Sequence, residues 1–186
     1  MRNNFVSSIG EILGKIQVSD SIKESFLTRA KEGNVTRDEN PRDHFCVYFA
    51  GYDPEKKLVF VGHHIKSGLW LFNGGHIDKG ELPLQAVARE IGEEWGDACV
   101  PGLIPDPGLL TIAQIEHPEK MICEKHYDIW YFIPLNSNTF APDEKLLAKE
   151  FHAWGWKTIP EARAFIREKN TQAALDYIEN AFFETA

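Results

Sequence analysis

Two stretches near the amino terminus repeat apolar residues every three or four positions, which is the spacing of an amphipathic α-helix. The apolar positions are Phe5, Ile9, Ile12, Leu13 and Ile16 in the first stretch, and Ile22, Phe26 and Ala30 in the second. Asp20 precedes the second stretch at a suitable N-cap position. The pattern predicts two short helices, and the polar segment 33–43, with Asn40-Pro41 as a breaker, predicts a loop after them.

Short runs rich in aromatic and β-branched residues follow this loop and are typical of β-strands. The predicted strands cover residues 45–52, 57–64, 69–72, 109–115, 126–134 and 151–156. The turn sequence Asp53-Pro54-Glu55-Lys56 separates the first two strands and predicts a hairpin.

Helical spacing returns at three places after the third predicted strand. The first helix carries Leu84, Val87, Ile91 and Trp95 on the face that we expect to enter the core. A second helix is expected from Pro160 to about Lys169, because proline is favoured in the first turn. For the last helix the sequence predicts Thr171 as the cap, with Leu175, Ile178 and Phe182 facing inward.

Composition and charge narrow the function classes. A chain of 186 residues with 43% hydrophobic residues is typical of one main globular domain. Its net charge of -8 repels a phosphate backbone, so we expect no duplex nucleic acid as a partner. No apolar run reaches about 18 residues, and the first 16 residues mix charged with apolar positions. We therefore expect no membrane partner and a cytoplasmic location.

The cysteines and histidines show none of the spacings of known zinc motifs. Cys46, Cys99 and Cys123 include no C-x-x-C pair and are interpreted as buried free thiols. The histidines lack an H-x-x-x-H or H-E-x-x-H arrangement with an acidic partner, and most are expected on the surface or at strand edges. They are His44, His63, His64, His76, His117, His126 and His152.

The most informative stretch is a glycine loop that runs into a helix crowded with carboxylates. Glu93 and Glu94 stand three and four positions after Glu90, so the three side chains share one side of the helix. Like charges at this spacing cost about 0.2–0.5 kcal/mol per pair, and carboxylates near a helix C-terminus oppose its dipole. A bound cation would offset the repulsion, and clustered oxygen ligands suit Mg²⁺ or Mn²⁺. A glutamate-rich face that is merely solvated is the alternative.

The whole stretch matches the Nudix box, G-x5-E-x7-R-E-U-x-E-E-x-G-U, in which U is aliphatic. The fixed positions are Gly75, Glu81, Arg89, Glu90, Ile91, Glu93, Glu94 and Gly96, while Asp97 replaces the final aliphatic residue. The chain therefore resembles the Nudix hydrolase family. The resemblance implies a Nudix fold over residues 41–186, an α/β/α sandwich with a mixed β-sheet. Residues 1–40 then form an N-terminal helical extension.

The resemblance also implies a chemistry and a cofactor. It implies hydrolysis of a small nucleoside diphosphate derivative, whether a nucleoside triphosphate, a nucleotide sugar or a dinucleotide, with Mg²⁺ or Mn²⁺ as cofactor. Glu90 and Glu94 are then the main metal ligands, Glu93 a further ligand or the base, and Gly75 a ligand through its carbonyl. Arg89 orients the glutamates. Water attacks phosphorus in line as the leaving group departs.

Other residues complete this hypothesis. The base of this family can lie downstream of the box, which makes Glu150 a candidate, although a charged residue on a solvated loop explains Glu150 equally well. His76 and Lys66 are candidates for contact with phosphate. The resemblance implies that Glu81, at the helix start, supports the loop and reaches a metal through water.

Other functions remain open within the same fold. A Nudix-like module that binds a nucleotide without cleaving it is the main alternative, although such modules usually have eroded box glutamates. An isomerase acting on an isoprenoid diphosphate is disfavoured, because its cysteine and glutamate motifs are absent. The N-terminal helices have two candidate roles, covering the site or forming a homodimer.

Overall fold

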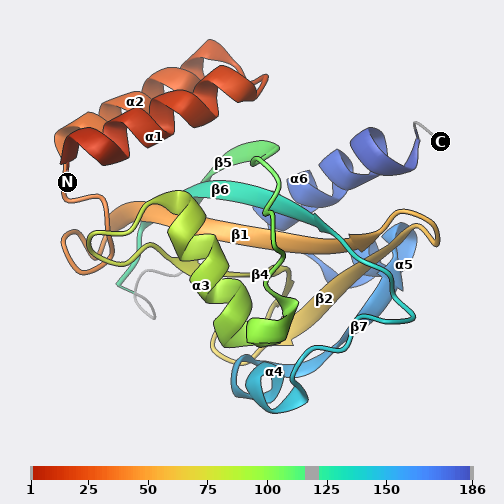
Figure 1. The fold of residues 1–186 in the computed structure, drawn as a ribbon. Coiled ribbons are helices and arrows are strands. Elements are labelled where there is room, and N and C mark those ends of the chain that lie inside the picture. The colour runs from red at the N-terminus through yellow and green to blue at the C-terminus, as the bar shows by residue number, and fades with distance from the viewer. Residues whose placement is uncertain (1, 116–121, 185–186) are drawn as a thin grey trace. The chain divides into compact units, whose positions relative to one another are not determined.

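The computed structural model describes residues 2–115 and 122–184. The chain divides into two compact units. The first contains Met1–Tyr48, Gly75–Val87 and Asp106–Tyr131, and the second contains Phe49–Gly74, Ala88–Pro105 and Phe132–Ala186. Figure 1 draws the elements in chain order.

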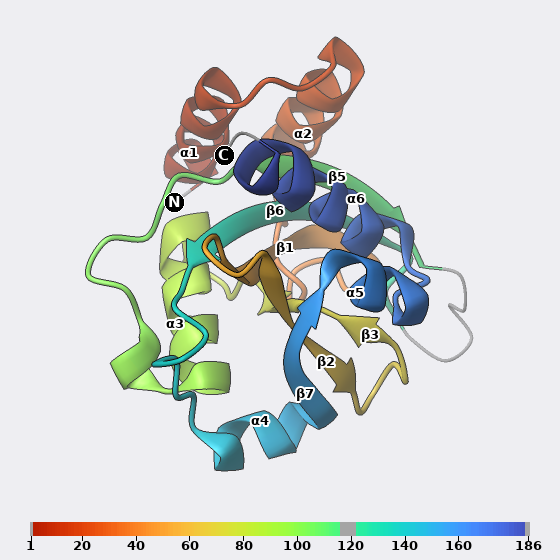
Figure 2. The same cartoon turned by 90° about the vertical axis from the view of Figure 1, so that its right-hand side faces the viewer.

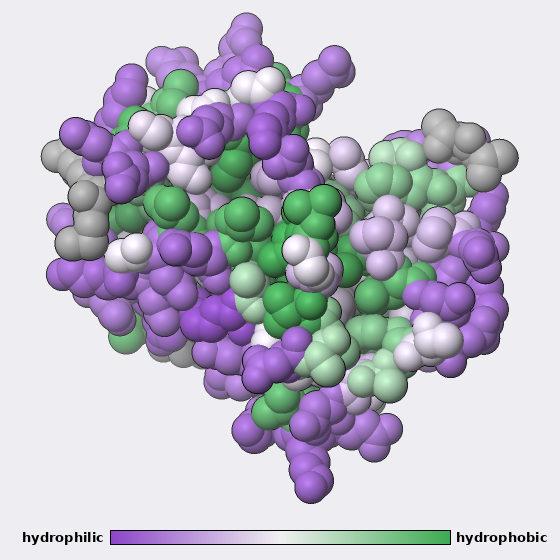
Figure 3. Space-filling model, viewed as in Figure 1, coloured by the Kyte–Doolittle hydropathy of each residue, from purple (hydrophilic) through white to green (hydrophobic). Residues whose placement is uncertain are grey.

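In the first unit, the two predicted amino-terminal helices are present as α1 (Arg2–Lys15) and α2 (Asp20–Glu32). They lie side by side (Figure 1), and most of the side chains that they present on the face seen in Figure 3 are hydrophilic. Ser19, not Asp20, caps α2 by accepting a hydrogen bond from the Ile22 amide. The apolar stripes are buried, and Phe5 and Phe26 meet Phe45 edge-on with ring centroids 5.1 and 5.7 Å apart.

The strands of the first unit are the beginning of β1 (Asp43–Asp53), β5 (Leu109–Gln114) and most of β6 (Lys125–Pro134). β5 and β6 pair antiparallel from Leu109 opposite Trp130 to Gln114 opposite Lys125. The Tyr48 ring stacks on Trp130 at 4.6 Å. The segment before β1 contributes no strand, as predicted.

The second unit contains the predicted hairpin and the last strand. β1 pairs antiparallel with β2 (Leu58–His64), and β2 pairs with β3 (Trp70–Leu71) and with β7 (Phe151–Thr158), which lies beside it in Figure 2. Gly62 of β2 is required here, since a Cβ at that position would lie 2.3 Å from the Phe151 ring.

The helices of the second unit begin with most of α3 (Pro83–Trp95), which packs the Trp95 ring edge-on against Phe49 and Phe140 at 4.8 and 4.9 Å. The prediction for its core face was wrong at one position, because Leu84 in the first turn is 54% exposed. The other helical elements are the 3₁₀ turn η1 (Asp97–Cys99), α4 (Glu144–Glu150), α5 (Ile159–Phe165), α6 (Lys169–Ile178) and the π turn η2 (Glu179–Phe183).

Two local predictions for this half of the chain are corrected, and one helix is added. The helix after Pro160 ends at Phe165 and not near Lys169. Glu168 caps α6, because its carboxylate accepts the amides of Asn170 and Thr171, whereas Thr171 itself lies inside the helix. The helix α4 was not predicted at all.

Hydrogen bonding orders the strands β3-β2-β1-β6-β5, with β4 (Asn73–His76) on β1 and β7 on β2. The short strand β4 was not predicted, because its two glycines resemble a loop. None of the helices in the described part of the chain is both long and apolar enough to cross a membrane. The division of the chain at residue 40 into an extension and a domain stays a prediction.

Candidate active site

The carboxylates of α3 differ in their exposure. Glu90 and Glu94 stand one helical turn apart and are only 8% and 6% exposed, whereas Glu93 is exposed. Charged side chains are seldom buried to this degree unless they are paired or bind an ion. The helix therefore presents two buried acids and one solvated acid along neighbouring positions.

Glu94 receives hydrogen bonds from the strand that begins at Asn73. The Asn73 side-chain amide donates to Glu94 Oε2, and the Gly74 backbone N–H donates to Oε1 at 3.3 Å. The pKa of Glu94 is raised to about 8, mainly by burial and also by the negative charge of Glu90, and the two donors only partly oppose this rise. The site thus places a carboxyl group where its negative charge is poorly stabilised by the described residues.

Arg89 lies between two of the glutamates. Its Nη1 donates to Glu90 Oε1 at 2.8 Å and to Glu93 Oε2 at 3.0 Å. The second contact joins positions i and i+4 on the helix surface, where such side chains meet. These contacts fix the relative positions of Glu90 and Glu93.

The end of α3 accommodates the departure from the Nudix box. The helix ends at Trp95, and Gly96 follows with a φ of 98°, a left-handed conformation that favours glycine. Asp97 then begins η1, and its Oδ1 would lie 2.9 Å from a Cβ at Gly92. The Asp97 side chain therefore packs against the small Gly92, and the helix closes without an aliphatic residue at this position.

Glu150 is the last residue of α4, so the alternative that placed it on a solvated loop was wrong. The Asp143 amide that starts this helix donates to the Trp95 carbonyl at 2.9 Å, and the Glu150 carbonyl accepts the Ile65 amide at 2.8 Å. These bonds attach α4 to the end of α3 and to the end of β2. The negative charge of Glu150 also raises the pKa of Glu94, so the two carboxylates influence each other.

Two basic side chains from the end of β2 face Glu150. Lys66 Nζ lies 3.0 Å from Glu150 Oε2, and His64 Nε2 lies 3.7 Å from the same oxygen. Burial lowers the pKa of His64, while the charge of Glu150 raises it. The structure therefore brings together two of the residues singled out from the sequence, Lys66 and Glu150.

The glycine loop belongs to the first unit from Gly75 onward. Glu81 supports the loop as expected, because its carboxylate accepts the Asp78 amide at 3.0 Å. His76 lies in a group with other histidines and a cysteine, where its Nε2 is 3.9 Å from Cys123 Sγ. Contact of His76 with phosphate stays a prediction.

Sequence reasoning missed two features of the site region. Asn73 was not singled out, although a polar residue between the apolar Phe72 and two glycines is a local signal for a special role. The grouping of His44, His76 and His126 was missed, because these residues are distant in the sequence. His44 and His126 are buried, so the expectation that most histidines lie at the surface fails for them.

The three cysteines are free, as predicted, but only Cys46 and Cys123 are buried and Cys99 is half-buried. His117 lies outside the described residues.

A divalent cation fits the residues of α3. The donor set consists of carboxylate oxygens, which Mg²⁺ and Mn²⁺ prefer. Glu94 is buried beside Glu90, and a cation would relieve the burial and repulsion that raise its pKa. Each carboxylate oxygen of Glu94 also keeps a lone pair beyond the hydrogen bond that it accepts.

Comparison with known proteins agrees with this architecture. The family model described as NUDIX domain matches residues 40–179. An RNA pyrophosphohydrolase from Ruthia magnifica subsp. Calyptogena magnifica is 28% identical over 109 residues, which cover 55% of this chain and 61% of the relative. The match thus spans less than two thirds of that relative.

Two solved structures share the fold. The E. coli dihydroneopterin triphosphate pyrophosphohydrolase matches with a TM-score of 0.61 and 18% identity, covering 74% of this chain and 94% of that chain. The NUDIX domain of Shewanella oneidensis NrtR, solved with ADP ribose, matches with a TM-score of 0.56 and 15% identity, covering 73% and 86%. The predicted α/β Nudix fold is confirmed, and the chain belongs to the NUDIX domain family.

Proposed function

We propose that this chain is a pyrophosphohydrolase that cleaves the diphosphate linkage of a nucleoside diphosphate derivative with the help of Mg²⁺ or Mn²⁺. The observation that carries the proposal is the buried carboxylate of Glu94. It lies beside Glu90 and is held by donors from Asn73 and Gly74. A family module that had lost its chemistry would have no need to keep this costly arrangement.

Glu90 and Glu94 would hold the cation, with Glu93 and the Gly75 carbonyl as further ligands. When bound, the ion neutralises charge on the diphosphate oxygens and lowers the pKa of a coordinated water. Arg89 keeps Glu90 and Glu93 in place through its contacts at 2.8 and 3.0 Å. Asn73 holds Glu94 in one orientation.

Glu150 is the proposed general base, and Glu93 is the alternative. A base must accept the proton of the attacking water. The charge of Glu150 raises the pKa of Glu94, so Glu150 interacts with the proposed metal ligand. Lys66 Nζ lies 3.0 Å from Glu150 Oε2 and holds that carboxylate at the end of α4. Lys66 is also the proposed contact for substrate phosphate.

The substrate is proposed only by class. The relative described above is named an RNA pyrophosphohydrolase. One structural neighbour is named a dihydroneopterin triphosphate pyrophosphohydrolase, and another was solved with ADP ribose. All three ligands carry phosphate groups. The reaction class that the acidic site supports is cleavage of a phosphate anhydride.

The test is hydrolysis of a panel of substrates in Mg²⁺ and in Mn²⁺, with both products identified. The panel contains nucleoside triphosphates, nucleotide sugars, dinucleotides and an RNA oligonucleotide with a terminal triphosphate. We expect cleavage of at least one compound between two phosphorus atoms and a loss of about 100-fold or more in Glu94→Gln.

The matched control is Glu55→Gln, which makes the same chemical change at an exposed turn position. It should keep wild-type activity. A wild-type protein that cleaves none of these compounds, but still binds one, would replace the proposal by the non-catalytic module. Equal activity in wild type and Glu94→Gln would remove Glu94 from the site.

A further inference from the structure

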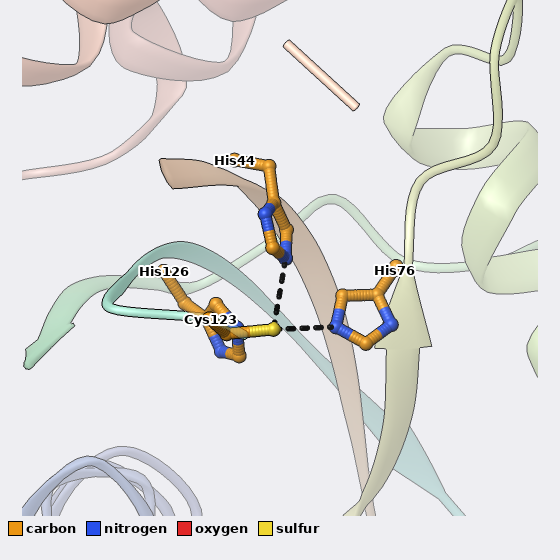
Figure 4. A group of neighbouring side chains, drawn as sticks. All are labelled: His44, His76, Cys123 and His126. Carbon is orange, nitrogen blue, oxygen red and sulfur yellow. Dashed lines mark hydrogen bonds between the residues drawn. The ribbon is translucent and has the colours of Figure 1, made fainter. Parts of the chain in front are cut away.

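Three histidines and one cysteine converge in the first unit (Figure 4). Cys123 Sγ lies 3.8 Å from His44 Nε2 and 3.9 Å from His76 Nε2. The ring of His126 lies 4.8 Å from that of His44, measured between centroids. One nitrogen from each histidine and the sulfur all lie within 4.8 Å of one another. We call these four residues the His-Cys cluster.

The backbone of three separate segments brings the cluster together. His44 is on β1, His76 ends β4, and His126 is the second residue of β6 with Cys123 just before that strand. The Arg42 carbonyl, two residues before His44, accepts the amides of residues 124 and 125 at 2.8 and 2.9 Å. The Ile77 amide, next to His76, donates to the Phe45 carbonyl at 3.4 Å. These backbone hydrogen bonds between adjacent residues bring the four side chains together.

Two nitrogen atoms of the cluster, one on His44 and one on His126, have lone pairs available for a ligand. His44 Nδ1 lies 2.9 Å from the Asn40 carbonyl, which can only accept, so Nδ1 carries the proton and Nε2 presents a lone pair toward Cys123. His126 is 6% exposed, and its Nε2 has no hydrogen-bond partner in the described part of the chain. A buried polar atom without a partner is rare and needs an explanation.

The spacing fits a tetrahedral metal ion. Zinc binds sulfur at about 2.3 Å and imidazole nitrogen at about 2.0–2.1 Å, which places tetrahedral sulfur and nitrogen ligands about 3.5 Å apart. The observed separations of 3.8 and 3.9 Å exceed this value by a few tenths of an ångström. The other ligand atoms lie within 4.8 Å of one another, so closing the cluster around an ion needs rotations of the histidine side chains as well as of Cys123.

We propose that His44, His76, Cys123 and His126 form a four-coordinate binding site for a zinc ion. Three imidazoles and one thiolate are the soft and borderline ligands that zinc prefers, whereas Mg²⁺ prefers oxygen. All four positions come from the protein, so the site is closed in the way of a structural zinc site. The Asn40 carbonyl orients His44 through Nδ1, as outer partners of zinc-binding histidines commonly do.

Binding exchanges one proton for the ion. The thiol proton of Cys123, which faces His44 Nε2 without metal, is released to solvent, and the thiolate then binds zinc. His44 and His126 need to lose no proton. Burial lowers the pKa of His44, and burial together with the charges of His44 and Arg37 lowers that of His126 to about 3.

A neighbouring set provides a competing assignment. One ligand atom from each of Cys46, His126 and Asp128 lies within 4.8 Å of the other two, so this set shares His126 with the cluster. Asp128 Oδ2 accepts a hydrogen bond from Thr111 at 3.2 Å, which already uses one of its oxygens. This set offers three ligands instead of four. The source of the sulfur ligand, Cys123 or Cys46, distinguishes the two assignments.

The first experiment measures metal in the full-length wild-type protein after growth with zinc and desalting without chelator. We expect about one zinc per chain, and X-ray absorption showing three nitrogen ligands near 2.0–2.1 Å and one sulfur near 2.3 Å. A protein that retains no zinc, or zinc bound only to oxygen and nitrogen, would overturn the proposal. This test needs no variant to fold.

The second experiment replaces zinc by Co²⁺ and records thiolate-to-metal charge transfer in the near ultraviolet. Cys123→Ser should abolish the band and lower zinc retention at least tenfold, whereas Cys46→Ser and Cys99→Ser should keep both. Circular dichroism checks that each variant is folded. A band that survives in Cys123→Ser but is lost in Cys46→Ser would overturn the assignment.

The outcome is independent of the proposed hydrolase function. Glu94→Gln should retain the zinc in full, because the carboxylates of α3 are not its ligands. If zinc binds but no compound is hydrolysed, the zinc site stands and the proposed function fails. If the protein hydrolyses a compound but retains no zinc, the proposed function stands and the zinc site fails.

Discussion

The acidic residues of α3 and the His-Cys cluster are two groups of metal-binding side chains with opposite designs. The α3 group offers only carboxylate oxygens and includes the exposed Glu93. The His-Cys cluster offers nitrogen and sulfur, and His44, Cys123 and His126 are buried. Hard oxygen ligands with room for water suit an ion that must contact a phosphate, whereas a closed soft set suits an ion that holds segments together.

The two groups also differ in how the sequence encodes them. The α3 glutamates lie within five residues, so helical spacing alone places them on one side. The His-Cys cluster joins residues up to 82 positions apart, counted from His44 to His126. A local motif can be recognised in the sequence before the fold is known. A cluster assembled by strand pairing can be recognised only once the fold is known.

The largest predicted effects are a loss of activity when the α3 group is changed and a loss of zinc when the His-Cys cluster is changed. Glu90→Gln should lower kcat at least about 100-fold, equivalent to about 2.7 kcal/mol, because a buried metal ligand is lost. It should leave zinc content unchanged. His126→Ala should instead remove zinc. Activity assays and elemental analysis of both variants test this, and loss of zinc in Glu90→Gln would show that the groups are not separate.

A buried carboxylate in a purely structural role sharpens the comparison. Asp53 is buried, and burial alone would raise its pKa. The amides of Lys56, Ser137 and Glu55 outweigh this effect and lower the pKa to about 2. Asp53→Ala should reduce the free energy of unfolding by about 2–3 kcal/mol at neutral pH, because three amides lose their acceptor.

The sign of the pH dependence follows from that depressed pKa. Since the folded pKa of about 2 lies below the ordinary value of 3.8, the ionised Asp53 stabilises the fold at pH values above about 4. The difference between wild type and Asp53→Ala should therefore shrink as the pH falls from 4 through 2. Urea unfolding at a series of pH values measures it, with the exposed Asp38→Ala as the control. A difference that grows toward acid pH would contradict the account.

Asn73→Ala should have a smaller effect on the acidic site. The variant removes the donor to Glu94 Oε2 but no proposed ligand, so we expect about tenfold lower kcat. The Mg²⁺ concentration for half-maximal activity should also rise, a change that simple loss of folded protein would not cause. Asn4→Ala, on the exposed side of α1, is the control. Unchanged kcat and Mg²⁺ dependence would rule out a positioning role for Asn73.

The smallest predicted effect concerns Lys66. Because its contact with Glu150 is exposed, Lys66→Met should change the free energy of unfolding by less than about 0.5 kcal/mol. If Lys66 meets substrate phosphate, KM should rise about threefold to tenfold with Lys145→Met as the unaffected control. An unchanged KM would remove Lys66 from substrate binding.

The parts that sequence predicted well are those set by local patterns. The two N-terminal helices, the β1–β2 hairpin and the core residues Val87, Ile91 and Trp95 follow from apolar spacing and turn chemistry. The box residues identified the family from a single helix and loop. The predicted helix caps were less accurate, because Ser19 and Glu168 cap α2 and α6 in place of Asp20 and Thr171.

The parts that sequence did not predict depend on tertiary pairing. The short helix α4 was not predicted, and the place of Glu150 at its end follows from bonds to Trp95 through Asp143 and to Ile65. β4 is stabilised by pairing with β1 despite its two glycines. The burial of His44 and His126 likewise requires the strands around them.

The most direct test of the central claim is hydrolysis in H₂¹⁸O, with products followed by ³¹P NMR and mass spectrometry. Wild type in Mg²⁺ is predicted to place one ¹⁸O atom on a phosphate group of one product, because water attacks phosphorus. Glu94→Gln should form this product at least about 100-fold more slowly. Label on carbon instead of phosphorus, or equal rates in both proteins, would contradict the account.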